Sequence, residues 1–143
     1  MPNYVCYFHI VWTTKYRLPL ISPDVEKLLF KVIRHKCDVL RCTVLALNGV
    51  SDHVHLAVNI PPTIAPSKFV ADIKGTTSRR INTSFIGNEP FRWQRGYSIH
   101  TFGERALDPI VQYIENQKFH HHQGTLNNYL EQLDSIDDPN TTG

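Results

Sequence analysis

Apolar and polar residues alternate along this chain in a pattern that predicts an α+β domain. Period-two alternation favours strands over residues 4–13, 43–47 and 53–60, and a fourth strand within 91–102. Apolar stripes at helical spacing predict helices over about 23–41, 67–83 and 108–122, and a short helix near 126–133. The last eight or so residues are expected to fray.

Two of these helices carry start signals. Ser22 precedes Pro23, and Asp108 precedes Pro109. A short polar side chain caps backbone N–H groups, and proline fits the first helical position. We therefore expect Ser22 and Asp108 to be the N-caps of the first and third helices.

The segment 53–60 shows the clearest strand alternation. One face would carry Val54, Leu56, Val58 and Ile60, and the other His53, His55, Ala57 and Asn59. The core is expected to take the aliphatic face, which leaves the histidines on the opposite one. Turn residues at 48–49 and 51–52 predict a hairpin with the preceding strand.

The order strand, helix, strand, strand, helix, strand is the split βαβ pattern of ferredoxin-like folds. We expect a four-stranded antiparallel sheet with helices on one face and an appended C-terminal helix that bears Tyr113. Neither a repeat nor a low-complexity linker divides the sequence, so residues 1–143 are expected to form one domain.

Composition restricts the class further. The chain has 143 residues, 41% of them hydrophobic, and no apolar run near the length of a membrane span. We expect a soluble, cytoplasmic protein. Its cysteines, an odd number without a CxxC spacing, predict buried thiols rather than a disulfide framework or a zinc knuckle: Cys6, Cys37 and Cys42.

His53 and His55 are candidate metal ligands, because residues i and i+2 of a strand project from one face. The pair alone is also explained by two histidines on an exposed or edge strand. Asp52 could orient a ring as a hydrogen-bond acceptor. Two imidazoles and an amide oxygen suit Mg²⁺ or Mn²⁺ better than a closed zinc site, although zinc is not excluded.

Tyr113 and Gln117 lie one helical turn apart, which places a phenol beside a possible third ligand. Taken alone, Tyr113 is equally a boundary residue of the core. His121 lies near the same helical face and is an outside candidate for the ligand. His120, His121 and His122 cannot all serve one ion, because neighbouring helical positions point in different directions.

Net charge is only +2, but basic residues cluster beside aromatic ones in TKYR and FRWQRGY. Such clusters can contact phosphates and stack on unpaired bases, although a solvated charged face also explains them. The candidate DNA-binding residues are Lys15, Arg17, Lys74, Arg79, Arg80, Arg92 and Arg95. The three in the second helix are expected to point outward.

Four blocks, HIVWTTKYR, SDHVHLAV, FRWQRGYS and YIENQKFHH, closely resemble the small single-tyrosine HUH transposases in order and spacing. These TnpA-type enzymes of minimal insertion sequences have relatives associated with repetitive extragenic palindromes. The resemblance covers about residues 3–123. It implies that His53 and His55 bind a divalent metal, that Gln117 is the third ligand, and that Tyr113 is the nucleophile.

The resemblance also implies a homodimer with composite active sites and a substrate of single-stranded DNA marked by a hairpin. The chemistry would be metal-dependent cleavage and rejoining through a 5′-phosphotyrosine. A relaxase or rolling-circle endonuclease is the nearest alternative, although these enzymes usually carry a third histidine or a second tyrosine. A ferredoxin-like nucleic-acid-binding module without catalysis is another. A histidine-triad hydrolase is rejected because Ala57 occupies the next alternating position.

Overall fold

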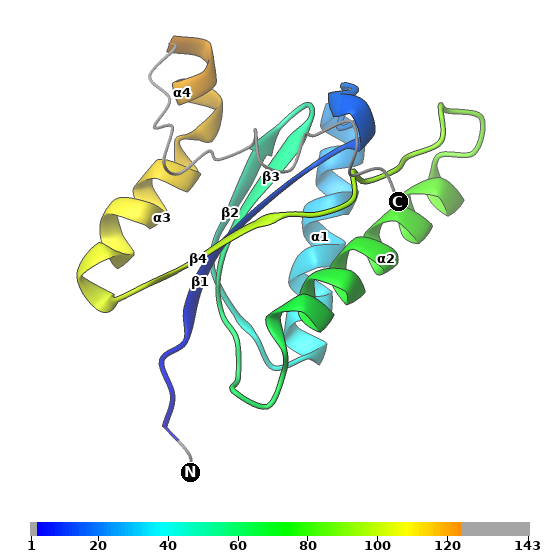
Figure 1. The fold of residues 1–143 in the computed structure, drawn as a ribbon. Coiled ribbons are helices and arrows are strands. Elements are labelled where there is room, and N and C mark those ends of the chain that lie inside the picture. The colour runs from blue at the N-terminus through cyan, green and yellow to red at the C-terminus, as the bar shows by residue number, and fades with distance from the viewer. Residues whose placement is uncertain (1–2, 124–143) are drawn as a thin grey trace.

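The computed structural model describes residues 3–123. Its strands are β1 (Tyr7–Thr13), β2 (Thr43–Val50), β3 (His53–Asn59) and β4 (Ser98–Phe102). Its α-helices are α1 (Pro23–Val39), α2 (Pro66–Ser84), α3 (Leu107–Glu115) and α4 (Gln117–Gln123), with 3₁₀ turns η1 (Lys15–Arg17) and η2 (Glu104–Ala106). The order of elements is the predicted one (Figure 1).

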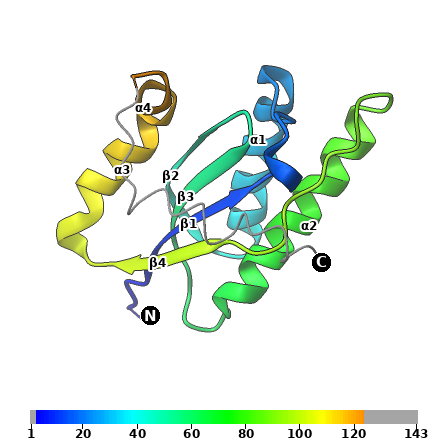
Figure 2. The same cartoon turned by 45° about the horizontal axis from the view of Figure 1, so that its top comes forward.

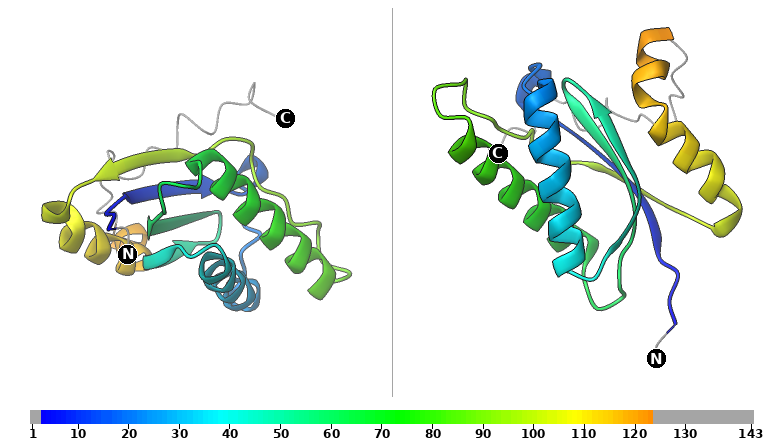
Figure 3. Two further views of the ribbon diagram at one scale, coloured as in Figure 1. Left: turned by 90° about the horizontal axis from the view of Figure 1, so that it is seen from below. Right: turned by 180° about the vertical axis from the view of Figure 1, so that it is seen from behind.

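The strands form one antiparallel sheet in the order β2-β3-β1-β4. This is the ferredoxin-like arrangement, so the predicted fold class is confirmed. Helices α1 and α2 cover one face of the sheet, and α3 with α4 lies on the other side (Figures 2 and 3). Strands β1 and β3 lie in the centre of the sheet, and α3 packs on β2 and β3, so β3 is covered by helices on both faces.

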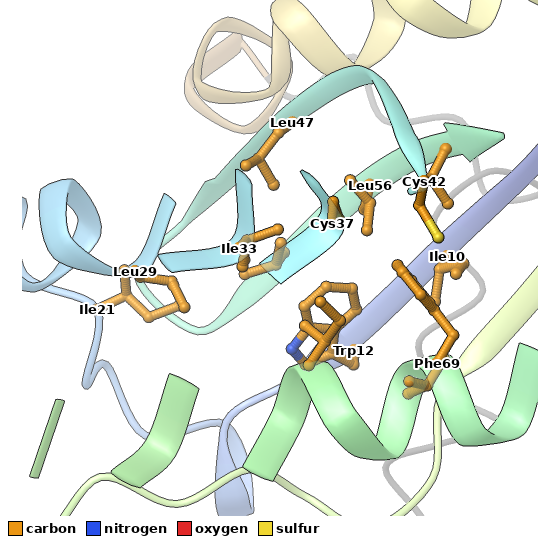
Figure 4. Close-up of a cluster of buried hydrophobic side chains, with 14 of the residues drawn as sticks. Ile10, Trp12, Ile21, Leu29, Ile33, Cys37, Cys42, Leu47, Leu56 and Phe69 are labelled. Atoms are coloured by element: carbon orange, nitrogen blue, oxygen red, sulfur yellow. The ribbon is translucent and has the colours of Figure 1, made fainter. Parts of the chain in front are cut away.

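The main core lies between the sheet and α1 and α2 (Figure 4). The aliphatic face of β3 belongs to it, as predicted, together with the large buried side chains of Trp12 and Phe69. A second, smaller cluster lies on the other face, where Ala57 packs against Ile110 and Ile114 of α3. The two faces of β3 thus bind two different layers.

Helix α1 begins as predicted. The Ser22 hydroxyl accepts the backbone N–H of Val25 at 3.3 Å, and Pro23 takes the first helical position. The helix ends at Val39, before Arg41, whose φ of 59° lies in the left-handed region. Burial raises the pKa of the Cys37 thiol to about 12 and that of Cys42 to about 11. All three cysteines are free, but Cys6 is only half-buried, contrary to the prediction.

The hairpin between β2 and β3 turns later than the first of the two predicted turn pairs. Asn48 and Gly49 lie inside β2, and the turn is made by Ser51 and Asp52. The strand therefore extends to Val50 rather than ending at residue 47. Asn48 pairs with His55 across the ladder, which makes it a neighbour of the histidines rather than a loop residue.

The predicted helix over 108–122 is in fact two helices. Its cap is not Asp108, because η2 leads directly into α3 and Asp108 falls in the first turn. The helix breaks at Asn116, whose φ of −97° and ψ of 19° are not helical. The Asn116 side-chain amide donates to the Gln112 carbonyl oxygen at 2.9 Å and competes with the backbone ladder there.

The predicted short helix near 126–133 and the predicted frayed tail lie outside the described residues. Within the described part of the chain, none of the helices has both the length and the apolar character needed to cross a membrane.

Gly49 allows β2 to approach the backbone of β3 beside His53. A Cβ atom at Gly49 would lie 2.4 Å from the His53 carbonyl oxygen, whereas one at Gly75 would meet nothing within 4 Å. We expect Gly49→Ala to lower the free energy of unfolding by roughly 1–3 kcal/mol, as overpacking does. Gly75→Ala, in a helix, is the control and should raise it by roughly 0.5–1 kcal/mol. Urea unfolding measures both, and a Gly49→Ala protein as stable as the parent would contradict this account.

Candidate active site

His53 and His55 project from the face of β3 that α3 covers, as the alternation predicted. Both side chains are fully buried. They are not part of the main aliphatic core, and their rings lie 5.3 Å apart between centroids, at an interplanar angle of 65°. The strand therefore holds two imidazoles next to each other in a layer between sheet and helix.

Each histidine has a hydrogen-bond partner on Nδ1. His53 Nδ1 lies 2.7 Å from Asp52 Oδ1, which confirms Asp52 as the predicted acceptor. His55 Nδ1 lies 2.9 Å from His9 Nε2 on β1, and the centroids of the His9 and His55 rings are 5.1 Å apart. With Nδ1 engaged in this way, Nε2 is the nitrogen through which each ring would bind a ligand.

Asp52 lies between His53 and the guanidinium group of Arg17. Its Oδ2 atom lies 3.4 Å from Arg17 Nε. Burial would raise the pKa of the Asp52 carboxyl, but the hydrogen bond and charge of His53, together with Arg17, outweigh it and hold the pKa below its usual range. Asp52 is therefore a carboxylate that accepts from both sides.

Tyr113 lies on α3 with its ring against His55. The ring centroids are 6.1 Å apart, at an interplanar angle of 71°, and the Tyr113 side chain is only 9% exposed. On its other side it stacks on His120 of α4 at 4.6 Å. The predicted tyrosine and histidine pair are thus brought together within one chain.

Gln117 is fully buried at the start of α4. The break at Asn116 changes the direction of the chain, so Gln117 follows Tyr113 on a separate helix rather than one turn along the same one. His120, left without a role by the sequence, contacts Tyr113. His121 lies in α4.

Asn48 fastens the junction between α3 and α4 to the sheet. Its side-chain Nδ2 donates to the Glu115 carbonyl oxygen at 2.9 Å, and its Oδ1 accepts from Lys118 Nζ at 2.7 Å. The two contacts flank Gln117, and Asn48 itself pairs with His55 in the sheet register. Sequence reasoning missed this role because it assigned Asn48 to a turn.

The two basic, aromatic blocks meet at one end of the sheet. The Lys15 backbone N–H donates to the Arg92 carbonyl oxygen at 2.9 Å, and the Tyr16 N–H donates to Gln94 Oε1 at 3.2 Å. The Thr14 N–H donates to the Asp52 carbonyl oxygen, which brings this surface next to the histidines. The loop platform, defined as residues 14–17 and 91–97, therefore borders the candidate active site.

Tyr16 and Arg17 give the loop platform an unusual backbone. Their φ values of 56° and 55° lie in the left-handed region, which non-glycine residues rarely adopt. Tyr16 is also 66% exposed. Residues held in strained backbone conformations cluster at active sites and ligand-binding sites.

Lys74 does not point outward as predicted. Its ammonium group donates to the carbonyl oxygens of Gln94 at 2.7 Å and Gly96 at 2.9 Å. Burial lowers the pKa of Lys74 to about 8. The amphipathic pattern of α2 does not reveal this, because the loop that covers the residue is distant in sequence. Lys74 supports the loop platform from below.

Arg79 and Arg80 are exposed on α2, away from the loop platform. Arg80 lines a cavity of about 290 Å³ between α1 and α2, together with Lys31, His35 and Lys36. The predicted basic residues therefore fall into two groups on different parts of the surface. One contains Lys15, Arg17, Arg92 and Arg95, and the other contains Arg80 with cations that the sequence did not single out.

The chain matches the family model of IS200-like transposases over residues 2–117. It is 29% identical over 118 residues to the transposase of insertion element IS200 from Salmonella typhimurium, covering 78% of this chain and 76% of the relative. It is also 29% identical to the ISDra2 transposase TnpA of Deinococcus radiodurans, covering 77% of this chain and 82% of the relative.

Solved structures agree with the sequence comparison. A crystal structure described as a transposase from Deinococcus radiodurans R1 has a TM-score of 0.67 at 30% identity, covering 81% of this chain and 93% of that one. A REP-associated tyrosine transposase bound to a REP hairpin has a TM-score of 0.65 at 15% identity, covering 85% and 73%, and shares the fold.

These matches identify a small single-tyrosine transposase. The chain belongs to the IS200-like transposase family, whose members cleave DNA and transfer strands. The resemblance deduced from the four sequence blocks is therefore confirmed.

The Asn48 contacts predict how firmly α3 and α4 are held. Asn48→Ala removes both side-chain bonds to the Glu115–Lys118 segment. We expect amide hydrogen exchange in 110–120 to become faster by about tenfold, since a neutral hydrogen bond contributes about 1 kcal/mol. Asn88→Ala, on an exposed turn, is the matched control. Unchanged exchange of 110–120 in Asn48→Ala would show that other contacts hold these helices.

Proposed function

We propose that this protein cleaves and rejoins single-stranded DNA through a covalent bond to Tyr113. The observation that carries the proposal is the contact between the Tyr113 ring and His55, whose neighbour His53 is buried on the same face. A phenol beside two oriented imidazoles is the donor set that tyrosine-mediated phosphoryl transfer requires. Membership of the IS200-like family supports the same reaction class.

In the proposed reaction, the Tyr113 oxygen attacks the scissile phosphorus as its proton is lost. The bond between phosphorus and the 3′ oxygen breaks, and that oxygen takes up a proton. The products are a 5′-phosphotyrosine and a free 3′-OH. Because the new ester keeps the phosphodiester bond energy, a second 3′-OH can attack it, release Tyr113 and join the strands without ATP.

The residues fit a divalent cation such as Mg²⁺ or Mn²⁺. His53 and His55 would coordinate through Nε2, because their Nδ1 atoms are hydrogen-bonded to Asp52 and His9. The Gln117 amide would be the third ligand. Among the described residues, groups of three or more His, Cys, Asp or Glu able to hold an ion are absent, which agrees with a mixed histidine and amide set. Bound there, the ion would supply Lewis-acid stabilisation of the phosphate charge.

The loop platform is the proposed contact surface for the single strand. Arg17, Arg92 and Arg95 are exposed and would contact phosphates, while the exposed ring of Tyr16 would stack on a base. Lys15 joins this group. Lys74 donates hydrogen bonds to carbonyl oxygens of the loop platform, and we do not propose that it contacts DNA. Arg79 and Arg80 would contact phosphates elsewhere along the substrate.

The proposed substrate is a strand marked by a hairpin. A structural relative of the same fold was solved with a REP hairpin bound, which supports this choice. The nearest alternative remains a rolling-circle or relaxase-type endonuclease, which would share the tyrosine chemistry. A binding module without catalysis would bind without a chelator effect and would form no covalent adduct.

Tyr113→Phe tests the nucleophile. The substitution removes only the phenolic oxygen, so the covalent adduct with labelled single strands should disappear while hairpin binding stays within about twofold. The probe is a pool of end-derived strands with Mn²⁺, and mass spectrometry locates the adduct. Tyr4→Phe is the control and should form the adduct as the parent does. An adduct that persists in Tyr113→Phe would refute the covalent role.

The histidines are tested in the same assay. His53→Ala and His55→Ala should remove metal-dependent cleavage and leave strand binding largely intact, because the loop platform is unchanged. Cleavage that responds to Mn²⁺ in the double variant would place the metal site elsewhere.

We further propose that Tyr113 acts on DNA held by the histidines of its own chain. Within the chain Tyr113 already contacts His55, so a second subunit is not needed to bring the phenol to the imidazoles. The homodimer implied by the family resemblance stays a prediction, and its composite site is the competing arrangement.

Complementation separates these arrangements. Tyr113→Phe and the His53→Ala/His55→Ala variant are each expected to be inactive. The two variants carry different affinity tags and are co-expressed. One sample is purified through both tags in turn, and a second sample is assayed without this selection. We expect no cleavage in either sample. Cleavage at about a quarter or more of the parent rate would show that the tyrosine of one subunit serves the histidines of another.

A further inference from the structure

His9 is a third histidine in the layer between the sheet and α3. It lies on β1 opposite Ala57 of β3 and His100 of β4, and only 2% of it is exposed. Its Nε2 lies 2.9 Å from His55 Nδ1, and the two rings lie edge to edge, with centroids 5.1 Å apart and an interplanar angle of 23°. Sequence reasoning gave His9 no role, although it falls in the block HIVWTTKYR.

The partners of the two proposed ligands differ in kind. Asp52 is a carboxylate and can only accept, so His53 carries a proton on Nδ1, and in its neutral form it presents a lone pair on Nε2. His55 faces an imidazole, which can either donate or accept. If His9 donated, His55 would carry its proton on Nε2, where a cation has to bind. The same hydrogen bond therefore supports or blocks the site according to its direction.

We propose that His9 is a positioning residue that accepts the Nδ1 proton of His55. In this direction His55 presents the Nε2 lone pair to the cation, and the hydrogen bond to His9 holds the ring in place. The inference rests on the proposed metal role of His55. It assigns His9 to orientation rather than to coordination, since its Nε2 is already committed to His55 and the described residues contain no site for an ion with three histidine ligands.

Two substitutions separate the hydrogen bond of His9 from the space that its ring fills. His9→Phe keeps an aromatic ring of similar size but removes the acceptor. His9→Gln removes the ring but places an amide oxygen near the position of Nε2. His35→Phe, on the exposed face of α1, is the control for the loss of a histidine.

The first readout needs neither metal nor DNA. Long-range ¹H–¹⁵N correlation at pH 8 reports which nitrogen of His55 carries the proton. We expect the Nδ1–H tautomer in the parent protein and in His9→Gln, and a shift towards Nε2–H in His9→Phe. An Nε2–H tautomer in the parent would overturn the proposal without any variant, which covers the case in which His9→Phe fails to fold.

The second readout is the affinity for Mn²⁺ alone, measured by titration calorimetry. Loss of a residue that orients a metal ligand typically weakens binding about 10- to 100-fold, which is the change expected for His9→Phe. His9→Gln should stay within about threefold of the parent, and so should His35→Phe. Equal losses in His9→Phe and His9→Gln would make His9 a direct ligand, and no loss in either would make it a packing residue. Both results contradict the proposal.

Failure of the proposed function would look different. Suppose that the parent protein binds Mn²⁺ and shows the expected tautomer but forms no DNA adduct. This result would support the orientation role of His9 and refute the proposed covalent chemistry. If the adduct forms while the His55 tautomer is insensitive to His9→Phe, the chemistry stands and the role of His9 falls.

Discussion

The arrangement of the candidate active site depends on β3, a central strand that is covered on both faces. Because side chains alternate along β3, Val54, Leu56 and Val58 enter the main core and the histidines must enter a second layer. Polar groups buried in that layer are costly unless they are hydrogen-bonded. The structure meets this demand with Asp52 on one ring and His9 on the other. The hydrogen bonds that make the layer stable also orient the rings.

The same layer needs a cover, and α3 provides it. Ile110 and Ile114 pack on Ala57, which places Tyr113, on the same helix, against His55. Asn48 then fixes the end of α3 and the start of α4 to the neighbouring strand. This packing brings the tyrosine to the histidines. The loop platform joins this arrangement through Asp52, whose side chain and backbone contact both regions.

Sequence periodicity was sufficient for the order of the elements and for both faces of β3, because these depend on local alternation and spacing. Periodicity was insufficient where contacts with residues distant in the sequence determine the environment of a side chain. Lys74 has an amphipathic helix position but serves loop carbonyls twenty or more residues away. Asn48 has the sequence context of a turn residue, but it lies within the longer β2, and its side chain donates to the Glu115 carbonyl oxygen. His9 becomes a neighbour of His55 only through the pairing of β1 with β3.

The central claim is that one chain assembles the tyrosine, the two histidines and a cation into a single pocket. A crystal structure of the parent protein grown with Mn²⁺ tests it most directly, because anomalous scattering locates the ion independently of the protein atoms. The account predicts a peak bonded to Nε2 of His53 and of His55, with the hydroxyl of Tyr113 from the same chain beside it. A peak elsewhere, or a Tyr113 ring that has left His55 for another subunit, would contradict it.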